Sequence, residues 1–454
     1  MLNAVVLLKF YKGEISLFDQ SAIECALSIP DAKVTLLAMA PQSVKEKLAA
    51  LTRLGDIRGI LISDEKYKGS DTLATSKVLS AAVKKIKPDI VLCGRQSMDG
   101  DTAQVPPQVA TFLGYDFIPY AMDFNLTKIR TRLGDRVVNL PTVISVERIK
   151  TLRFPSLRSE AKYVEIWDNS LLCLNESEAG ISGSKTEVLK VFDKKKSERK
   201  CKFISPEKIA DVINECKGQT SVREFDVRAD IKLDKVFVIG DAVIEIAKCL
   251  AEEVVVIESD DAEIIADTLE KAKAKHVLFE ASLINRTVAP KVAARLNCGL
   301  AADCVGLETD GKKLFCLRPA NADNVLALIG FKSQTEMATV RCSQPSGDVV
   351  FSVGYGAKDY VEKIKGFALK FGGEVAASRK VVDSGILEYE RQVGLTGKVI
   401  SPKVYVAIGI SGEVQHLVGI ENAKTVIAIN RDKNAKIFEY ADYGVVEDIK
   451  NVEL

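Results

Sequence analysis

Short apolar runs alternate with amphipathic stretches along almost the whole chain. Residues 34–38, 59–62 and 90–93 have the length and composition of buried strands. Residues 20–28 and 71–85, which separate such runs, carry apolar side chains at helical spacing. Strands and helices that alternate in this way predict parallel sheets with helices on both faces, so the expected fold class is α/β.

The same alternation begins again twice further along the chain. Further strands are predicted at residues 236–239, 254–257, 276–279, 349–353, 374–377, 404–408 and 426–429. Further helices are predicted at residues 43–54, 242–250, 262–273, 288–296 and 359–371. Because the first two units share this coarse pattern, a distant internal duplication stays open.

Two polar segments indicate where domains end. Residues 193–200 (DKKKSERK) contain no apolar side chain, and residues 344–348 (QPSGD) form a turn cluster. A chain of 454 residues is also too long for a single hydrophobic core. We therefore expect three domains, at residues 1–200, 201–343 and 344–454.

Composition narrows the class of partner. The chain carries 63 basic and 62 acidic residues, a net charge of +1 that disfavours nucleic acid or an anionic membrane surface as its main partner. No apolar run reaches the roughly 20 residues that a membrane helix needs, so no membrane insertion is expected. The apolar start of the chain, residues 4–10, suits a first buried strand better than a signal peptide.

The ten cysteines follow neither a metal-binding nor a disulfide pattern. No C-x-x-C is present, and the nearest pair is Cys298 and Cys304. We therefore expect no metal site, and we expect buried thiols in a reducing, cytoplasmic compartment.

A glycine-rich turn follows the strand predicted at residues 404–408. The turn reads Gly409-Ile410-Ser411-Gly412, and a predicted helix that contains His416 comes next. Ligands of open parallel sheets bind beyond the carboxyl ends of strands, where backbone N–H groups suit phosphate or a carbonyl oxygen. An imidazole at this place also suits a carbonyl or an anion. A tight turn and a structural histidine are the alternatives.

Two more segments of the C-terminal third are candidates for the same site. Arg379 follows the strand predicted at residues 374–377, where a fixed cation suits an aromatic or anionic ligand. Residues 393–397 form another glycine-bracketed loop. A surface ion pair and a plain turn are the alternative interpretations.

The N-terminal third contains a second candidate site. After the strand at residues 90–93 comes a run of mostly polar or small residues, which suits a phosphate held by backbone N–H groups and Arg95. Residues 69–76 open a helix, and N-capping alone could explain their composition.

The C-terminal third contains five segments that match one family pattern: ASRKVVDSG (377–385), QVGLTGKVISP (392–402), VYVAIGISGEVQH (404–416), VIAINRD (426–432) and ADYGVVED (441–448). Together they closely resemble the flavin domain of the α subunit of electron transfer flavoproteins. The resemblance implies FAD, with Ser378, Arg379 and Thr396 at the isoalloxazine ring and His416 near its O2. Asn430 and Asp448 would hold the adenosine and ribityl portions. The residues implied to contact FAD are Tyr355, Ser378, Arg379, Val393, Gly394, Leu395, Thr396, Ser411, Gly412, Glu413, Val414, Gln415, His416, Asn430 and Asp448.

Three residues depart from the pattern of that family. Tyr355 stands where the family usually has an arginine, and Leu395 where a polar residue commonly precedes the loop threonine. Glu413 replaces a small residue, and its carboxylate would disfavour an anionic reduced flavin by charge repulsion. The changes leave two interpretations open, a tuned flavin potential or a weakened affinity for FAD.

The first 205 residues contain five segments that match a second pattern: GSDTLATS (69–76), LCGRQSMDGDTAQV (92–105), LPTVIS (140–145), FPSLR (154–158) and SKTEVLKVF (184–192). They resemble the β subunit of the same family, which implies a second nucleotide, either AMP or a second FAD. The Gly-Asp-Thr-Ala-Gln run is similar to that of electron-bifurcating members, so bifurcation with NADH stays open. The residues implied to contact this nucleotide are Leu7, Gly94, Arg95, Gln96, Ser97, Asp99, Gly100, Asp101, Thr102, Ala103, Gln104 and Val105.

This part departs from the family pattern at three places. Pro106 stands where the bifurcating group usually has glycine, and the loop after the first strand is cut to residues 10–15. The family's partner-recognition loop, expected after residues 154–158, is missing. The missing loop leaves open whether the chain docks onto acyl-CoA dehydrogenases in the way usual for the family.

The middle of the chain resembles the first, structural domain of the α subunit at residues 289–296, 299–304, 317–320 and 337–341. The resemblance thus covers nearly the whole chain, with a β part and an α part fused in that order. It implies two adenine-nucleotide-hydrolase-like parallel-sheet domains, followed by a doubly wound FAD-binding domain.

We therefore expect an electron carrier that takes electrons through FAD from a flavin-dependent dehydrogenase or another redox partner protein and passes them on. No catalytic acid, base or nucleophile is expected, because the flavin supplies the chemistry. The alternative is a nucleotide-binding regulatory or assembly module without redox turnover. A nicotinamide dehydrogenase has little support, because no Gly-x-Gly-x-x-Gly follows an early strand.

Overall fold

The chain folds into two compact units. The structure is a computed structural model that describes residues 1–97, 99–193, 199–218, 225–320, 325–342, 346–395 and 397–453. The first unit consists of Met1–Val191, Val227–Asn321 and Leu326–Val340. The second unit consists of Phe192–Asp226, Ala322–Val325 and Arg341–Leu454. In the described residues, no helix is both long and apolar enough to cross a membrane.

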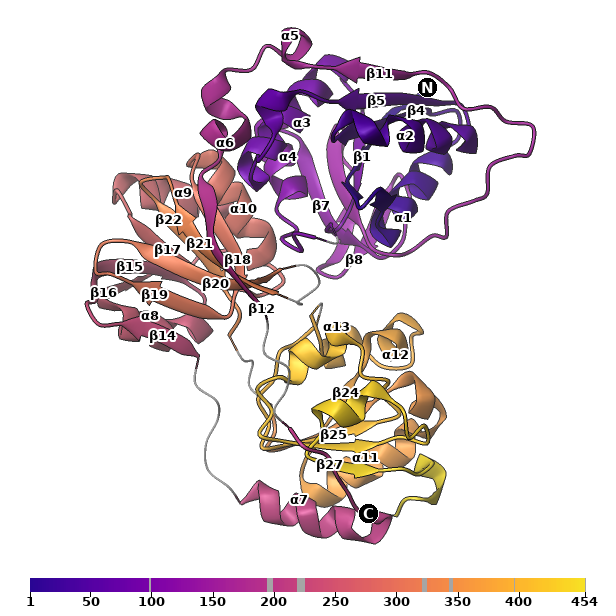
Figure 1. The fold of residues 1–454 in the computed structure, drawn as a ribbon, viewed down its shortest axis with the longest axis vertical. Helices are drawn as coiled ribbons and strands as arrows, with labels where there is room; N and C mark the ends of the chain where they lie inside the picture. The colour runs from indigo at the N-terminus through magenta and orange to yellow at the C-terminus, as the bar shows by residue number, and fades with distance from the viewer. Residues whose placement is uncertain are drawn as a thin grey trace. The chain divides into compact units, whose positions relative to one another are not determined.

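The first unit opens with a nine-stranded sheet in the order β11-β5-β4-β1-β6-β10-β7-β8-β9 (Figure 1). Its strands are β1 (Asn3–Leu8), β4 (Lys33–Met39), β5 (Ile57–Ile62), β6 (Ile90–Gly94), β7 (Asp116–Ala121), β8 (Lys128–Thr131), β9 (Gly134–Val137), β10 (Thr142–Val146) and β11 (Val164–Trp167). Its helices are α1 (Leu17–Leu27), α2 (Lys45–Leu51), α3 (Thr72–Ile86) and α4 (Val105–Leu113). A short hairpin, β2 (Phe10–Tyr11) with β3 (Glu14–Ile15), follows β1.

Both faces of this sheet are buried, as its apolar strands predict. Ala4, Val6 and Leu8 of β1 belong to one hydrophobic cluster, and Val5 and Leu7 belong to another. Because successive side chains of a strand point to opposite faces, the two clusters lie on opposite sides of the sheet. This arrangement explains why β1 and its neighbours are continuous apolar runs rather than alternating ones.

A five-stranded parallel sheet repeats the same topology, in the order β16-β15-β17-β22-β18. Its strands are β15 (Leu233–Ile239), β16 (Ala251–Val256), β17 (His276–Glu280), β18 (Gly299–Cys304) and β22 (Glu336–Val340). Its helices are α8 (Ile244–Leu250), α9 (Ala262–Lys271) and α10 (Asn285–Arg295). The chain enters these strands in the same sequence as β1, β4, β6, β7 and β10, which lie in the corresponding order in the larger sheet.

A left-handed residue occurs at equivalent positions of β7 and β18 in the two sheets. Tyr120 and Asp303 are each the fifth residue of their strand, and each has a φ of 55°. The backbone N–H of Tyr120 donates to Oγ of Ser145 at 3.0 Å, and that of Asp303 donates to Oγ1 of Thr339 at 2.8 Å. The internal duplication that the sequence left open is therefore present in the fold.

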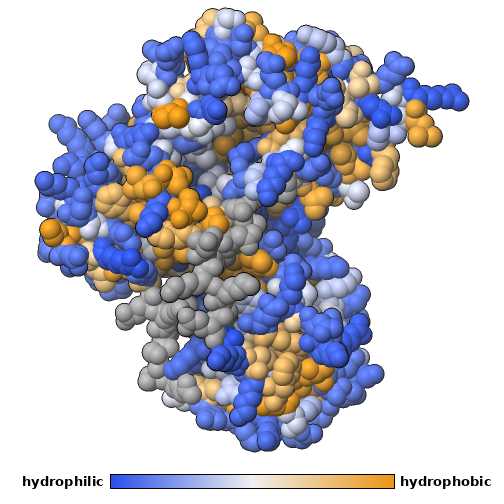
Figure 2. Space-filling model, viewed as in Figure 1, coloured by the Kyte–Doolittle hydropathy of each residue, from blue (hydrophilic) through white to orange (hydrophobic). Residues whose placement is uncertain are grey.

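A third sheet in the first unit has the order β12-β21-β20-β19-β14. Its strands are β12 (Thr186–Asp193), β14 (Asp226–Ala229), β19 (Gly306–Thr309), β20 (Leu314–Ala320) and β21 (Val325–Phe331). Strand β12 lies within the β-like sequence, yet it pairs with the α-like strand β21. It is an edge strand with exposed apolar side chains at Val188 and Val191, and Figure 2 shows orange atoms over this part of the first unit.

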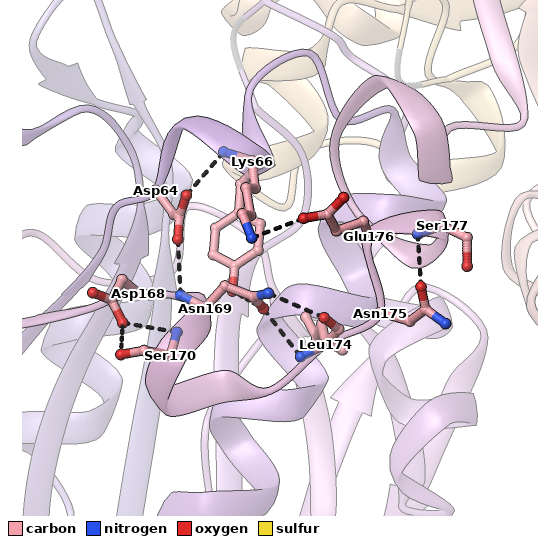
Figure 3. A network of polar contacts seen from close by, with 10 residues as sticks. Asp64, Lys66, Asp168, Asn169, Ser170, Leu174, Asn175, Glu176 and Ser177 are labelled. Carbon is pink, nitrogen blue, oxygen red and sulfur yellow. Dashed lines mark hydrogen bonds and ion pairs between the residues drawn. The ribbon is translucent and has the colours of Figure 1, made fainter.

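A polar network fixes the segment that leads to β12 (Figure 3). Oδ2 of Asp64 accepts a hydrogen bond from the backbone of Asn169 at 2.9 Å, and Nζ of Lys66 pairs with Glu176 at 2.8 Å. Asn169 in turn donates to the carbonyl of Leu174 at 3.0 Å. These contacts hold the short helices α5 (Asn169–Leu172) and α6 (Gly180–Gly183) near the first sheet.

The second unit contains one six-stranded parallel sheet in the order β13-β27-β26-β25-β23-β24 (Figure 1). Its strands are β13 (Lys202–Phe203), β23 (Val349–Val353), β24 (Glu374–Ala377), β25 (Val404–Ile408), β26 (Thr425–Ile429) and β27 (Tyr443–Val445). Its helices are α7 (Ile209–Lys217), α11 (Val361–Phe371), α12 (Arg379–Asp383) and α13 (Val414–Leu417). The helix predicted after Gly412 is thus only four residues long, and a 3-10 turn, Val418–Ile420, continues it.

Residues 199–218 fold with the second unit, although the predicted limits put residues 201–218 in the middle domain. The backbone N–H groups of Lys202 and Ile204 donate to carbonyls of Asp442 and Gly444 at 2.9 Å. The apolar face of α7, which includes Ile209 and Ile213, is buried in the core beneath β25. Residues 194–198 of the predicted linker and residues 343–345 near the second predicted limit lie outside the described residues.

The thiols are less uniformly buried than predicted. Cys173 and Cys249 are exposed, Cys201 and Cys342 are half-buried, and the other six are buried. All ten are free. The prediction fails for Cys173 because it ends α5 in a left-handed conformation at the surface, outside any apolar cluster.

Candidate functional site

A cleft lies at the carboxyl edge of the second unit's sheet. Strand β23 has β24 on one side and β25 on the other, so the chain turns in opposite directions from β23. Ligands of doubly wound folds bind at this kind of switch point. The cleft measures about 300 Å3, part of it open solvent. Its lining residues are Gly356, Ala357, Gly409, Ile429, Asn430, Arg431, Glu447, Asp448 and Ile449.

Backbone atoms form one wall of the cleft because glycines let two loops touch. The N–H of Gly354 donates to the carbonyl of Ile408 at 2.7 Å, and the N–H of Gly356 donates to that of Gly409 at 3.2 Å. Gly409 has a φ of +64°, and a Cβ there would lie 2.6 Å from the nitrogen of Ala357. Any larger residue would push the loops apart.

Asn430 and Asp448 supply the polar side chains of the cleft. Nδ2 of Asn430 donates to the carbonyl of Ile410 at 2.9 Å, which ties the end of β26 to the glycine turn. Asp448 begins a 3-10 turn, and its Oδ1 accepts from the backbone of Lys450 at 3.0 Å. Carboxylate oxygens at a strand's carboxyl end suit the hydroxyls of a ribose.

His416 lies below the surface of this edge. Its Nε2 is 2.8 Å from the hydroxyl of Tyr405, a completely buried residue of β25. Burial lowers the pKa of His416 to about 4, so the imidazole is neutral near pH 7. Ser411, Glu413 and Gln415 are exposed and Val414 is half-buried, while Gly412 and His416 are buried.

Arg379 stands at the carboxyl end of β24, as the sequence predicts, and it is the first residue of α12. Its Nε donates to Oδ2 of Asp383 at 3.0 Å, an ion pair one helical turn along. Ser378 is the N-cap residue of α12 and donates its backbone N–H to the carbonyl of Val353 at 2.9 Å. The guanidinium is half-buried. Its Nε takes part in an ion pair, which was the alternative interpretation of this residue from the sequence.

The loop at residues 393–397 is pinned between two elements of the site. The N–H of Val393 donates to the carbonyl of Ala377 at 3.0 Å, and the N–H of Leu395 donates to that of Gln415 at 2.6 Å. Gly394 has a φ of +139°, and a Cβ there would lie 2.6 Å from the oxygen of Gln415. Thr396 lies outside the described residues.

Sequence analysis missed part of the cleft lining. The lining residues that were not predicted all lie within a few residues of a strand's carboxyl end: Gly356, Ala357, Ile429, Arg431, Glu447 and Ile449. Proximity to a strand's carboxyl end could have identified these residues, because the segments after β23, β25, β26 and β27 all meet at this edge of the sheet.

The first unit has a second switch point, between β1 and β6. Leu7 is buried in β1 beside Cys93 of β6. A Cβ on Gly94 would lie 2.6 Å from Oδ1 of Asp19, so only glycine fits there. Burial raises the pKa of Asp19 to about 7.

Arg95, the residue predicted to hold phosphate, is buried among protein groups. Its Nη1 lies 3.5 Å from Oε1 of Glu147, and Nε of Arg132 lies 2.7 Å from the same oxygen. The Arg95 guanidinium also sits 5.0 Å from the ring centroid of Phe18. Two cations and one carboxylate therefore meet in the interior at the end of β6.

The polar loop after Arg95 is held from both of its flanks. Nε2 of Gln96 donates to Oδ1 of Asp101 at 3.0 Å, and Asp99 pairs with Lys9 at 2.8 Å. Nε2 of Gln104 donates to the carbonyl of Leu300 in β18 at 3.0 Å.

The rest of the loop is half-buried and similarly tied to the duplicated sheet. The carbonyl of Gly100 accepts from Nη2 of Arg318 at 2.7 Å. Asp101 and Ala103 have φ values of 50° and 53°. Ser97, Thr102 and Val105 are half-buried.

The parallel sheets and the cleft at the switch point of the second unit define an α/β nucleotide-binding protein. Comparison with known proteins gives its family. Residues 345–421 match the model "Electron transfer flavoprotein FAD-binding domain". Residues 5–144 and 235–344 match "Electron transfer flavoprotein domain". The chain belongs to the electron transfer flavoprotein family, and its C-terminal part is a FAD-binding domain.

Curated relatives match different parts of the chain. "Electron transfer flavoprotein subunit alpha" of Thermoanaerobacterium thermosaccharolyticum is 34% identical over 238 residues, which cover 42% of this chain and 72% of the relative. "Electron transfer flavoprotein subunit beta" of Megasphaera elsdenii is 38% identical over 205 residues, 38% of this chain and 74% of the relative. "Lactate dehydrogenase (NAD(+),ferredoxin) subunit LctC" of Acetobacterium woodii is 31% identical over 237 residues, 42% of this chain and 57% of the relative. The predicted fusion of β-like and α-like sequences is confirmed.

The residues of the second unit fit FAD. The cleft combines a backbone wall near two glycine turns with the side chains of Asn430 and Asp448. The cleft is partly open to solvent, so a dinucleotide would extend beyond it along the edge of the sheet.

Proposed function

We propose that this chain carries electrons between a dehydrogenase and a downstream acceptor through FAD in its second unit. The observation that supports this proposal is the cleft at the switch point between β23 and β25, within residues that match a FAD-binding domain. FAD would supply the redox chemistry, and the protein would hold it and set its electrostatic surroundings.

We assign the residues of this site by where they lie. Asn430 and Asp448 would hold the adenosine and ribityl portions, because they line the cleft. Ser378, Arg379 and the loop at residues 393–397 would border the ring, since they follow β24 at the same edge. His416 would act as a neutral hydrogen-bonding group next to Tyr405, because burial keeps its pKa low.

A second nucleotide in the first unit, AMP or FAD, is the next part of the proposal. The loop after β6 is shaped by left-handed residues and lies at a switch point, which supports a phosphate site built from backbone N–H groups. Because Arg95 is engaged with Glu147, this site would depend on the loop backbone more than on that side chain.

Flavin and AMP stoichiometry after denaturing release tests both parts. One FAD and one AMP per chain would support a simple carrier, and two FAD per chain would support the bifurcating type that the name of the Acetobacterium relative suggests. A purified chain without flavin absorbance bands that also takes up no added FAD would overturn the carrier proposal and favour a nucleotide-binding module.

The redox partner is proposed only by class. Family membership implies a partner protein that delivers or accepts electrons. We propose a flavin-dependent dehydrogenase, and reduction of the chain's flavin by candidate dehydrogenases with their substrates is the direct test. A flavin that is reduced by NADH alone would point instead to the bifurcating type.

A further inference from the structure

Two lysines flank the ring of Tyr355 in the second unit. Nζ of Lys380 lies 4.1 Å from the ring centroid, and Nζ of Lys358 lies 4.6 Å from it. The Lys358 ammonium is also 3.5 Å from the Tyr355 hydroxyl. Both distances are well inside the roughly 6 Å within which a cation is attracted to an aromatic ring.

The three residues come from two elements at the carboxyl edge of the sheet. Tyr355 and Lys358 belong to the 3-10 segment Tyr355–Tyr360 that follows β23, and Lys380 belongs to α12, which follows β24. Tyr355 is bonded in sequence to Gly356, which lines the cleft. Tyr355 as a residue is 37% exposed, so the two ammonium groups are held at the rim of the cleft rather than in the core.

The arrangement reduces the freedom of side chains that are otherwise mobile. A lysine on a surface normally samples many rotamers, and ordering it costs free energy when a ligand binds. An aromatic ring that contacts two ammonium groups restricts both of them before the ligand arrives. Tyr355 thus makes two positive charges available at a fixed place.

We propose that Tyr355, Lys358 and Lys380 form a recognition site for the diphosphate of the bound dinucleotide. This proposal rests on the FAD site proposed above and specifies which of its groups the rim contacts. The loop after the first strand of a doubly wound sheet is where a diphosphate approaches the backbone, and the cations stand on this loop and on its neighbour. Ammonium groups bind phosphate as point charges and need no exact geometry.

The neighbouring arginine is distinct from this pair. Nε of Arg379 is engaged with Asp383 at 3.0 Å, and its cation is partly balanced by that carboxylate. For Lys358 and Lys380 the described contacts include the Tyr355 ring and no ion pair with a carboxylate. Their two charges therefore exceed the negative charge of their described partners, which is the condition for attracting an anion.

The first experiment separates a diphosphate from the flavin ring as the group that is recognised. The full chain is freed of nucleotide, and the dissociation constant and midpoint potential of added FAD are measured for wild type, Lys358→Gln and Lys380→Gln. A diphosphate keeps its charge when the flavin is reduced. Each variant should thus weaken FAD binding by roughly threefold to fivefold and leave the potential unchanged. The loss should shrink at high ionic strength.

The matched control is Lys370→Gln, which removes one exposed positive charge near the end of α11, before β24 begins at the opposite edge of the sheet. It should leave the affinity for FAD unchanged. A fivefold loss confined to reduced FAD would lower the potential by about 20 mV and would overturn the diphosphate assignment in favour of the ring. Unchanged affinity in both lysine variants would also overturn it.

The role of the aromatic ring has its own test. Tyr355→Phe keeps the ring and should bind FAD like wild type, whereas Tyr355→Leu keeps bulk without the ring and should weaken FAD binding. Equal effects of the two variants would overturn the role of the ring. A wild-type chain that binds no FAD at all would instead overturn the proposed function, so the two failures are distinguishable.

Discussion

The hydroxyl of Tyr405 lies 2.8 Å from Nε2 of His416, and both residues are buried in the second unit. Tyr405 is the second residue of β25, and His416 follows the glycine turn after that strand. The bond therefore joins the core of the sheet to the segment that borders the cleft. An imidazole in this place stays neutral because burial opposes its charged form.

This burial predicts a pH dependence of stability. The folded pKa of His416, about 4, lies below its unfolded value near 6.5, so the unfolded state binds more protons between these values. Its contribution is complete above pH 6.5 and should be lost as the pH falls towards 4, on the order of 3 kcal/mol. Urea unfolding at several pH values measures this. His416→Gln should flatten the dependence, and an equal slope in the variant would contradict the assignment.

The raised pKa of Asp19 predicts that the stability of the first unit decreases as the pH rises, the opposite of the effect of His416. Burial raises its folded pKa to about 7, so its stabilising contribution is complete below about pH 4 and is lost as the pH rises through 7. Asp19→Asn stays neutral and should gain stability relative to wild type between pH 5 and 8, on the order of a few kcal/mol. Fluorescence of Trp167, the one tryptophan of the chain, reports unfolding of this unit. Asp31→Asn, at an exposed position, is the control and should show no such gain.

Arg379 predicts a shift of the flavin potential. Its cation at the end of β24 would favour a negatively charged reduced ring, so Arg379→Ala should lower the potential by roughly 30 mV, which corresponds to a tenfold change in relative affinity. Spectroelectrochemistry of the FAD-loaded chain measures the shift. Lys370→Ala removes a distant cation and should leave the potential unchanged. An unchanged potential and spectrum in Arg379→Ala would count against its place beside the ring.

The position of α7 predicts which unit a core substitution in this helix destabilises. Ile213 is completely buried in the cluster beneath β25, so Ile213→Ala should destabilise the second unit by about 2–4 kcal/mol. Hydrogen exchange should speed up at amides of β25 and β27 and stay unchanged in β15 and β17. Val212→Ala, at a half-buried neighbouring position, should have a much smaller effect. Faster exchange in β15 would contradict the assignment of α7 to the second unit.

Local sequence predicted the strands well because apolar runs carry their own signal. The runs at residues 34–38 and 404–408 became β4 and β25, which are buried on both faces. The sequence could not show that residues 199–218 join a sheet whose other strands begin near residue 349, because the contact between β13 and β27 spans more than 200 residues. The only signal in the sequence was the apolar face of α7, which indicates that this segment packs against a hydrophobic core.

The family resemblance implied residues that follow strands, whereas contacts between neighbours in space could not be read from the sequence. Asn430 and Asp448 line the cleft because they follow strands. The ion pair of Arg95 with Glu147 could not be read from the sequence, because it depends on β10 lying beside β6. The contact of Lys380 with Tyr355 was missed for the same reason, since β24 ends beside β23.

The assignment of residues 199–218 to the second unit has a practical consequence for anyone who handles this polypeptide. The backbone leaves the first unit after β12, returns to it before β15, and leaves it again before β23. A protease that cuts the chain once between the units would leave them covalently joined through the other passages. Such nicked material would show two bands on a denaturing gel, and its fragments would not correspond to the two folded units.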